Sequence, residues 1–260
     1  MNNNPVGIID SGVGGLSIVA SLFKKLPNES IIYIADSKNC PYGDKSSKEI
    51  CNLSKTMVNL LLQKQIKLLI VACNTITVTS INKLRMSYPK LPIIGIVPVI
   101  KTAVRKSKNK RIGVFSTKAT AKSKYQKDLI NKFAKGFKVV NIGSTELVPL
   151  IESLDFEDMI QVLNKELAVF KKSQIDVLAL GCSHFPLVKK EIQKIIPNIL
   201  ILDSADAVSR QVERILIHNK ILSNSNKPSY NFYTTGDVKA LKYYVKKLTN
   251  RGKIERISLQ

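Results

Sequence analysis

Short apolar segments alternate with amphipathic ones along most of the chain. The apolar segments, such as those at residues 6–9, 68–72 and 177–180, predict buried strands of a parallel sheet. Between them, apolar residues recur every three or four positions, which predicts helices with one buried face. A Ser46-x-x-Glu49 capping box predicts where one of these helices begins. Alternation of this kind is typical of α/β folds, in which helices cover both faces of a parallel sheet.

The same pattern predicts the remaining elements. We expect further strands at residues 30–35, 93–96, 111–115, 138–142, 199–202 and 230–234. We expect one helix to begin at residue 16, one to begin at residue 46, and one to follow Cys73 and end at residue 86. We expect further helices at residues 123–133, 156–170, 188–195, 205–219 and 237–248. The Ser/Asn-rich segment 222–228 predicts a loop.

Two successive series of these elements predict two domains. The expected fold is α/β, with two pseudo-symmetric, doubly wound parallel-sheet domains and an active site in the cleft between them. The first domain would comprise residues 1–97 and 207–260, and the second residues 98–206. The chain would cross over near Pro98 and return near residues 203–206, which would make the first domain discontinuous.

The chain is basic, with a formal net charge of +22 over 260 residues. Residues 101–138 hold thirteen Lys or Arg and one acid, Asp128. This segment is either a nucleic-acid surface or a solvated lysine surface. We favour the second interpretation, because charge alone gives non-specific attraction and no nucleic-acid-binding motif accompanies it. We therefore expect no specific nucleic-acid partner.

Nothing in the sequence predicts a membrane protein. The longest apolar run, residues 93–100, contains Pro98 and is far shorter than a membrane span requires. The amino terminus lacks the charged and apolar regions of a signal peptide. Cytoplasmic residence is the expectation that follows.

Two of the four cysteines stand in similar contexts. Cys73 follows Leu-Leu-Ile-Val-Ala, and Cys182, 109 residues later, follows Val-Leu-Ala-Leu-Gly. Each thiol would therefore lie at the carboxyl end of a parallel strand, where open α/β folds bind ligands. A single buried cysteine is often only a small apolar side chain, but the matched pair predicts two catalytic thiols. Cys40 and Cys51 lack this context, and we interpret them as structural.

Two thiols facing one substrate suit the inversion of a carbon centre. One group removes a proton from one face and the other returns a proton to the opposite face. A thiolate near neutral pH requires a nearby cation or helix amino terminus, and both cysteines are expected to precede helices. Asp10, across the cleft from Cys73, and His184, just after Cys182, could carry protons or tune the thiols. Asp10 could instead be a helix cap, and His184 a structural histidine.

Other polar residues at the predicted strand ends suit a carboxylate substrate. Neutral donors are supplied by Ser11, Asn74, Thr75, Thr117, Thr120 and Ser183. Gly12, Gly14 and Gly15 do not complete a dinucleotide fingerprint, so we expect a tight turn whose amides approach a carboxylate. With no Cys-x-x-Cys pair and only two histidines, a structural zinc site is not expected, and His218 is interpreted as structural.

These segments together resemble the motifs of the glutamate racemase family. The resemblance rests on Asp10-Ser11-Gly12-Val13-Gly14-Gly15-Leu16, Pro41-Tyr42-Gly43, Ala72-Cys73-Asn74-Thr75 and Gly181-Cys182-Ser183-His184-Phe185-Pro186. It implies interconversion of L- and D-glutamate for peptidoglycan synthesis without metal, pyridoxal phosphate or nucleotide.

The resemblance also implies roles for individual residues. Cys73 would deprotonate D-glutamate and Cys182 the L-enantiomer, with Asp10 and His184 as further catalytic residues. Tyr42 and Gly43 would belong to the substrate-binding loop. Glu152 matches an acidic position near the family's active site, although a surface acid at a helix start is an equal alternative. Dimers are common in the family, so a homodimer is an open expectation.

The chain departs from the family pattern in three places. Ser183 and Phe185 stand where Thr and Tyr are more frequent, and Thr145-Glu146 replaces a frequent Cys-Pro. The chain also begins only a few residues before its first expected strand, unlike members activated by a cell-wall nucleotide precursor, so we expect no such activation. Two rivals remain at this point: racemisation of aspartate or another small amino acid, and a basic protein acting on nucleic acid.

Overall fold

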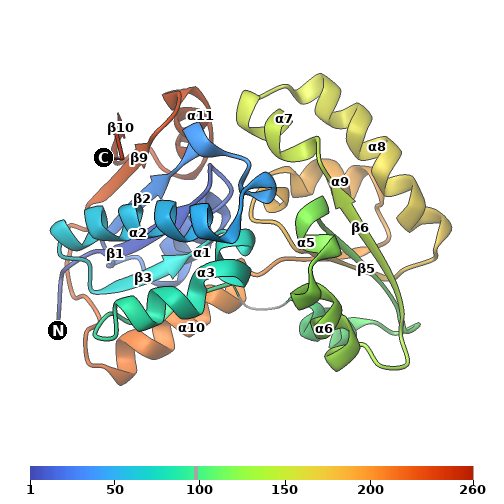
Figure 1. Ribbon diagram of the computed structural model, residues 1–260, viewed down its shortest axis with the longest axis horizontal. Coiled ribbons are helices and arrows are strands. Elements are labelled where there is room, and N and C mark those ends of the chain that lie inside the picture. Colours follow the sequence, from blue (N-terminus) through green and yellow to red (C-terminus); the bar gives the residue numbers. More distant parts are fainter. Residues whose placement is uncertain (97–98, 260) are drawn as a thin grey trace. The chain divides into compact units, whose positions relative to one another are not determined.

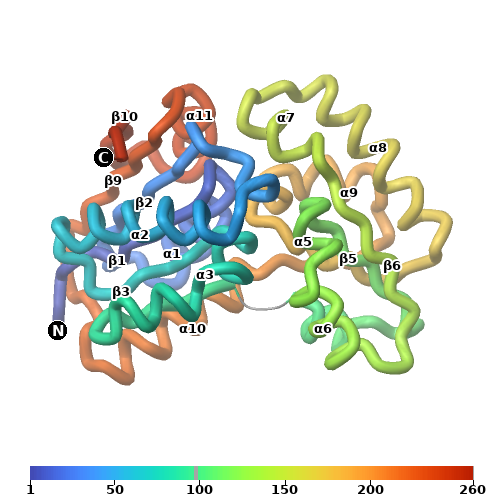
Figure 2. Tube along the Cα trace, in the orientation of Figure 1, coloured from blue at the N-terminus to red at the C-terminus, as the bar shows by residue number. Residues whose placement is uncertain are grey.

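The computed structural model describes residues 1–96 and 99–259. The chain divides into two compact units, unit 1 (Met1–Ile96 and Ala205–Gln260) and unit 2 (Val97–Ser204). Figures 1 and 2 show that the last part of the chain, drawn in orange and red, returns to the unit that holds the blue first part. The predicted boundary between residues 97 and 98 lies outside the described residues.

Unit 1 is built on a six-stranded sheet with the order β10-β9-β2-β1-β3-β4, and every neighbouring pair is parallel. Its strands are β1 (Val6–Asp10), β2 (Ile31–Ala35), β3 (Leu68–Val71), β4 (Ile93–Ile94), β9 (Tyr230–Thr234) and β10 (Lys253–Arg256). The central strands β1, β2 and β3 are buried at every position, as expected for strands covered on both faces.

The helices of unit 1 are α1 (Leu16–Lys25), α2 (Ser47–Gln63), α3 (Asn74–Ser87), α10 (Ala205–His218) and α11 (Val238–Leu248). The predicted capping box of α2 is confirmed: Ser46 Oγ accepts from Glu49 N at 3.3 Å, and Glu49 Oε2 accepts from Ser46 N at 3.0 Å. The face of α2 that packs into the core includes Ile50, Met57 and Leu61, whose spacing along the chain is that of an amphipathic helix.

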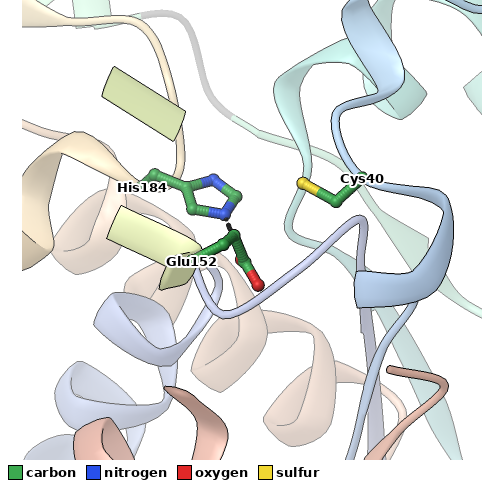
Figure 3. Close-up of side chains that lie close together, drawn as sticks. All are labelled: Cys40, Glu152 and His184. Carbon is green, nitrogen blue, oxygen red and sulfur yellow. Dashed lines mark hydrogen bonds and ion pairs between the residues drawn. The ribbon is translucent and has the colours of Figure 1, made fainter. Parts of the chain in front are cut away.

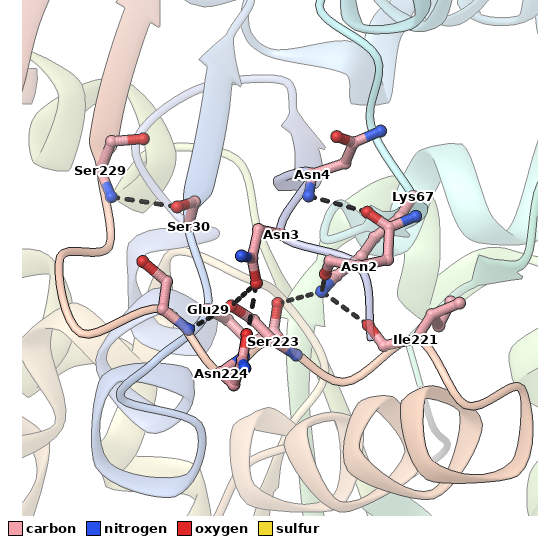
Figure 4. A network of polar contacts seen from close by, with 11 residues as sticks. Asn2, Asn3, Asn4, Glu29, Ser30, Lys67, Ile221, Ser223, Asn224 and Ser229 are labelled. Carbon is pink, nitrogen blue, oxygen red and sulfur yellow. Dashed lines mark hydrogen bonds and ion pairs between the residues drawn. The ribbon is translucent and has the colours of Figure 1, made fainter.

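A buried ion pair ties the amino terminus and the returning segment to the sheet (Figure 4). Lys67 Nζ lies 2.6 Å from Glu29 Oε2 and also donates to the carbonyls of Asn2 and Ile221. The other Glu29 oxygen accepts from Ser223 N at 2.7 Å. Because Lys67 also donates to two carbonyls and Glu29 also accepts from Ser223, this pair can stay buried and fixes the return of the chain after α10.

Unit 2 is built on a four-stranded parallel sheet with the order β6-β5-β7-β8. Its strands are β5 (Arg111–Thr117), β6 (Lys138–Ser144), β7 (Val177–Leu180) and β8 (Leu200–Leu202). Its helices are α4 (Val99–Lys106), α5 (Lys118–Lys122), α6 (Lys124–Phe133), α7 (Leu147–Ser153), α8 (Phe156–Lys172) and α9 (Lys189–Ile195). The predicted α/β class with two parallel sheets is confirmed.

Both sheets contain the same strand order. In unit 1 the order β2-β1-β3-β4 places the third strand beside the first, and in unit 2 the order β6-β5-β7-β8 does the same. In each sheet, the second strand lies on one side of the first strand and the third lies on the other side. Successive connections therefore lead in opposite directions away from the first strand. Open α/β sheets bind ligands at such a switch point, outside the carboxyl ends of the strands.

Several elements differ from the sequence prediction. Helices α4, α5 and α7 and strand β10 were not predicted, and β4 ends at Ile94 rather than Ile96. Helices α5 and α7 span five and seven residues, too few for a clear period. Strand β10 lies at a sheet edge and is mostly exposed, so it lacks an apolar signal. Within residues 1–96 and 99–259, none of the helices combines the length and apolarity needed to cross a membrane.

Candidate active site

The carboxyl ends of β1 and β3 in unit 1 bring Ser11 and Cys73 together. Ser11 directly follows β1, and Cys73 lies two residues beyond β3. Between β3 and Cys73, the Ala72 amide donates to the Ile9 carbonyl at 2.9 Å and so continues the pairing of the two strands. The Ser11 Oγ and Cys73 Sγ atoms lie 3.4 Å apart, and both side chains are buried. The predicted position of this thiol at a strand end is confirmed.

The Asp10 carboxylate is buried and organises the turn after β1. Its Oδ1 accepts from the Gly12 amide at 3.0 Å and from Ser11 Oγ at 3.4 Å. The alternative that Asp10 caps a helix is wrong, because the N-cap of α1 is Gly15 and has no side-chain cap. Asp10 ends β1 and Cys73 follows the adjacent strand β3, so the two residues lie at the same sheet edge of unit 1 and not across a cleft from each other. Ser11 therefore links the carboxylate to the thiol.

The glycine turn is held close to the sheet. Tyr33 Oη donates to the Gly12 carbonyl at 2.6 Å. At Gly15, a Cβ atom would lie only 2.7 Å from Ala72 Cβ, so a larger residue would push α1 away from the segment that carries Cys73. The Gly12 amide, expected to approach a substrate carboxylate, is already bonded to Asp10.

Cys73 is also the N-cap residue of α3. The amino terminus of a helix carries partial positive charge, which stabilises an anion such as a thiolate. Asn74 and Thr75 form the first turn of α3 and are half-buried. Their side chains form no hydrogen bond with the part of the chain that the structure describes, so their donors remain available to a ligand.

Tyr42 reaches a buried carboxylate instead of pointing freely into solvent. Its Oη donates to Asp36 Oδ2 at 2.6 Å, and both side chains are buried. Thr235 Oγ1 and Asn39 Nδ2 also donate to Asp36. Burial, and then the negative charge of Asp36, raise the pKa of Tyr42 well above its ordinary value, so the phenol stays protonated. Gly43 follows Tyr42 in a short 3₁₀ turn, Tyr42–Asp44.

Asp36 also belongs to this region, although no specific role was predicted for it. It follows β2, just as Asp10 ends β1, so its position at a strand end was the available signal. Its role in holding Tyr42 depends on Thr235, which is distant in sequence, and no local pattern shows that partner.

Unit 2 repeats the arrangement at the carboxyl ends of β5 and β7. Gly181, just before Cys182, donates its amide to the Phe115 carbonyl at 2.7 Å, which corresponds to the bond of Ala72 in unit 1. Thr117 ends β5 and caps α5, where its Oγ1 accepts from the Thr120 amide at 3.3 Å and donates to Thr120 Oγ1 at 3.0 Å. Cys182 is buried two residues beyond β7, so its predicted strand-end position is confirmed.

His184 and Glu152 form a pair in unit 2 (Figure 3). The His184 Nε2 atom lies 2.7 Å from Glu152 Oε1, and the side chains are 2% and 15% exposed. The His184 Nδ1 atom lies 3.5 Å from Ser183 Oγ. The alternative that Glu152 is an acid at a helix start is wrong, because it is the penultimate residue of α7. The carboxylate instead fixes the orientation of the imidazole.

The helix predicted at residues 188–195 is confirmed as α9 (Lys189–Ile195), but it does not follow Cys182 directly. Between them lies a 3₁₀ turn, Phe185–Val188, with His184 as its N-cap residue. Phe185 is buried against Phe115, with ring centroids 4.6 Å apart. Cys182 therefore has His184 nearby in sequence but no directly attached α-helix.

Two cysteine environments of this kind suit a racemase, and the comparison with known proteins agrees. The family model described as Asp/Glu/hydantoin racemase matches residues 6–212. The chain belongs to this family. A relative named glutamate racemase from Clostridium acetobutylicum is 40% identical over 225 residues, which cover 86% of this chain and 88% of the relative. The predicted glutamate racemase resemblance is confirmed.

Solved structures of racemases also share the fold. A glutamate racemase from Bacillus anthracis has a TM-score of 0.87 and 30% identity, and the match covers 100% of this chain and 99% of that one. A glutamate racemase from Escherichia coli, solved with L-glutamate and the activator UDP-MurNAc-Ala, has a TM-score of 0.87 and 29% identity, with 98% of each chain covered.

Proposed function

We propose that the chain interconverts L- and D-glutamate by proton transfer at Cα, with Cys73 and Cys182 as the two acid–base groups. The observation that carries the proposal is the equivalent position of the two thiols, each after the third strand of the same strand order. The activity is that of an isomerase, and the D-glutamate serves cell-wall peptidoglycan synthesis, the role typical of glutamate racemases.

The chemistry assigns complementary tasks to the two thiols. In each direction, one thiolate removes the α-proton, while the other thiol protonates the opposite face of the planar carbanion. Cys73 acts as the base on D-glutamate and Cys182 as the base on the L-enantiomer. After one turnover, the protonation states of the two sulfurs are exchanged, so the next turnover starts from the opposite enantiomer or follows proton exchange with solvent.

The neighbouring residues support each proton transfer differently. On the Cys73 side, the Ser11 hydroxyl lies within hydrogen-bonding distance of both the thiol and Asp10 Oδ1, so it can relay a proton or stabilise the thiolate. On the Cys182 side, His184 is held by Glu152 and serves as the nearby proton carrier. Asp10 and His184 are thus proposed to act next to the two thiols.

Substrate binding is assigned to the uncharged donors at the same strand ends. Asn74, Thr75 and Ser11 supply them in unit 1, and Thr117, Thr120 and Ser183 in unit 2. The Tyr42 phenol stays protonated and donates its hydrogen bond to Asp36, so it is not free to donate to a substrate. We therefore assign the loop of Tyr42 and Gly43 a supporting role in shaping the site. The E. coli relative binds L-glutamate, which is the substrate that these donors would take here.

Incubation with L-glutamate in deuterium oxide, without added cofactor, tests the proposal. We expect loss of the α-proton signal by NMR together with D-glutamate by chiral chromatography. Exchange with aspartate but not with glutamate would assign a different substrate. No exchange with either would contradict the racemase assignment.

Three further properties remain proposals on the same basis. We propose a cytoplasmic location, a homodimer and no specific nucleic-acid partner. Light scattering after size-exclusion chromatography tests the dimer. Titration with labelled DNA and RNA near physiological salt tests the absence of a specific nucleic-acid partner. Tight, sequence-selective binding would contradict it.

A further inference from the structure

A cavity of about 440 Å³ lies in unit 1, and neither Ser11 nor Cys73 lines it. It is bordered by residues at the carboxyl ends of three neighbouring strands: Asp36 follows β2, Thr235 follows β9, and Arg256 ends β10. The candidate active site instead lies at the ends of β1 and β3. The carboxyl edge of a parallel sheet is where this fold class binds ligands, and the volume is that of a small-molecule site.

The carboxylate in the wall of this cavity is already satisfied. Asp36 accepts from Thr235 Oγ1 and Tyr42 Oη at 2.6 Å each, and its two oxygens lie 3.0 Å from Asn39 Nδ2. Because these uncharged donors occupy both oxygens, Asp36 does not require a cation from a ligand. It closes one wall of the cavity.

Two cations, Lys38 and Arg256, border the same cavity. Lys38 and Arg256 are exposed, and neither forms an ion pair with a described residue. The Lys38 main chain is fixed, since its amide donates to Thr235 Oγ1 at 3.0 Å. A guanidinium and an ammonium beside one cavity favour an anion, and the guanidinium fork matches phosphate oxygens.

The rest of the lining is partly apolar. Leu53, Ile257 and Leu259 line the cavity and pack against the hydrophobic core of unit 1. We propose that this cavity binds a small organic phosphate, with the dianionic phosphate at Lys38 and Arg256 and an apolar body on these three side chains. Because neither cation pairs with a described acid, the two positive charges together favour a dianion over a monocarboxylate. This inference does not depend on the racemase activity.

Calorimetric titration of the full chain with phenyl phosphate in about 150 mM salt tests the site, since this salt screens long-range attraction to a basic protein. We expect Arg256→Ala and Lys38→Ala each to weaken binding about tenfold. Lys253→Ala is the matched control, because it removes the same charge from the other end of β10 and should leave the affinity unchanged. Inorganic phosphate and benzoate should each bind more weakly than phenyl phosphate.

Three results would overturn the inference. Equal affinity in the wild type, Arg256→Ala and Lys253→Ala would mean attraction by net charge alone. Benzoate or inorganic phosphate binding as tightly as phenyl phosphate would contradict the proposed ligand class. Displacement of phenyl phosphate by glutamate would place the binding in the candidate active site. None of these results would change the deuterium-exchange test of the racemase.

Discussion

The edge of unit 1 that carries Cys73 and the edge of unit 2 that carries Cys182 share one topology but not one environment. In both, the residue before the cysteine donates its amide to the neighbouring first strand. Cys73 is then the N-cap residue of α3, and its Sγ atom lies 3.4 Å from Ser11 Oγ. Cys182 instead precedes a 3₁₀ turn and is followed by an imidazole held by Glu152.

This difference shows that the features that position each thiol are distinct from the groups that assist its proton transfer. The strand order and the apolar strands place each sulfur at a switch point. The segments that follow determine whether a helix amino terminus with a hydroxyl, or a histidine–carboxylate pair, lies beside it. A reaction that runs equally in both directions can thus use two chemically different acid–base sites.

Removing either thiol gives the largest expected effect. Cys73→Ala and Cys182→Ala should each lower racemisation in both directions by about 10³-fold or more, because each direction needs both a base and an acid. The measurement is deuterium exchange at Cα together with chiral chromatography. Cys51→Ala is the control, since Cys51 is buried in α2. Near-normal turnover in either active-site variant would refute the two-thiol mechanism.

The histidine of unit 2 provides the next test. His184→Asn should lower kcat/KM by about 10²-fold through loss of the proton carrier. The factor must be the same in both directions, because the two enantiomers have equal free energy. The primary isotope effect with α-deuterated L-glutamate should rise more than that with the D-enantiomer, since the step at Cys182 is slowed.

The chain offers a matched control for this test. His218 is the only other histidine, is exposed, and ends α10. His218→Asn should leave kcat/KM unchanged. If the isotope effects of His184→Asn rise equally for both enantiomers, the proposal that His184 assists proton transfer at Cys182 is contradicted.

Substitution of Ser11 and of Ser183 allows a direct comparison of the two cysteine environments. Ser11→Ala should lower kcat by about tenfold, because it removes a hydrogen bond to a charged sulfur. Ser183→Ala should have a smaller effect of about threefold, since Ser183 Oγ makes a long contact with the His184 ring. Steady-state kinetics in both directions measures the two variants. Equal losses would mean that the Ser11 contact has no special part in catalysis.

The smallest effect on activity is expected at Tyr42, whose change should appear mainly in stability. Tyr42→Phe leaves Asp36 without one buried donor and should lower the free energy of unfolding by about 2 kcal/mol near neutral pH. Burial and Asp36 raise the pKa of Tyr42 in the folded chain above its value of about 10 in the unfolded chain. The contribution of Tyr42 is therefore complete below pH 10 and is lost as the pH rises further.

Urea denaturation between pH 8 and pH 11 measures this contribution. The wild type should be the more stable protein at pH 8, and its advantage over Tyr42→Phe should shrink above pH 10. A constant difference across this range would contradict the raised pKa. Unit 2 contains the corresponding ring–carboxylate pair in His184 and Glu152, which Tyr42→Phe should leave unaffected.

Local sequence patterns predicted most of the strands and helices. Residues 68–71 and 177–180 form buried strands because apolar runs that short and continuous suit a sheet covered on both faces. Ser46 and Glu49 predicted the start of α2, since a capping box involves only neighbouring residues. The strand-end positions of Cys73 and Cys182 followed from the same runs.

The contacts around the cysteines required the tertiary structure. Ser11 meets Cys73 across 62 residues, His184 meets Glu152 across 32, and Thr235 meets Asp36 across 199. The sequence could indicate each of these residues as polar and near a strand end, but not its partner. Those partners depend on which strands become neighbours and in which register, and that choice is made by the packing of the whole sheet rather than by any local period.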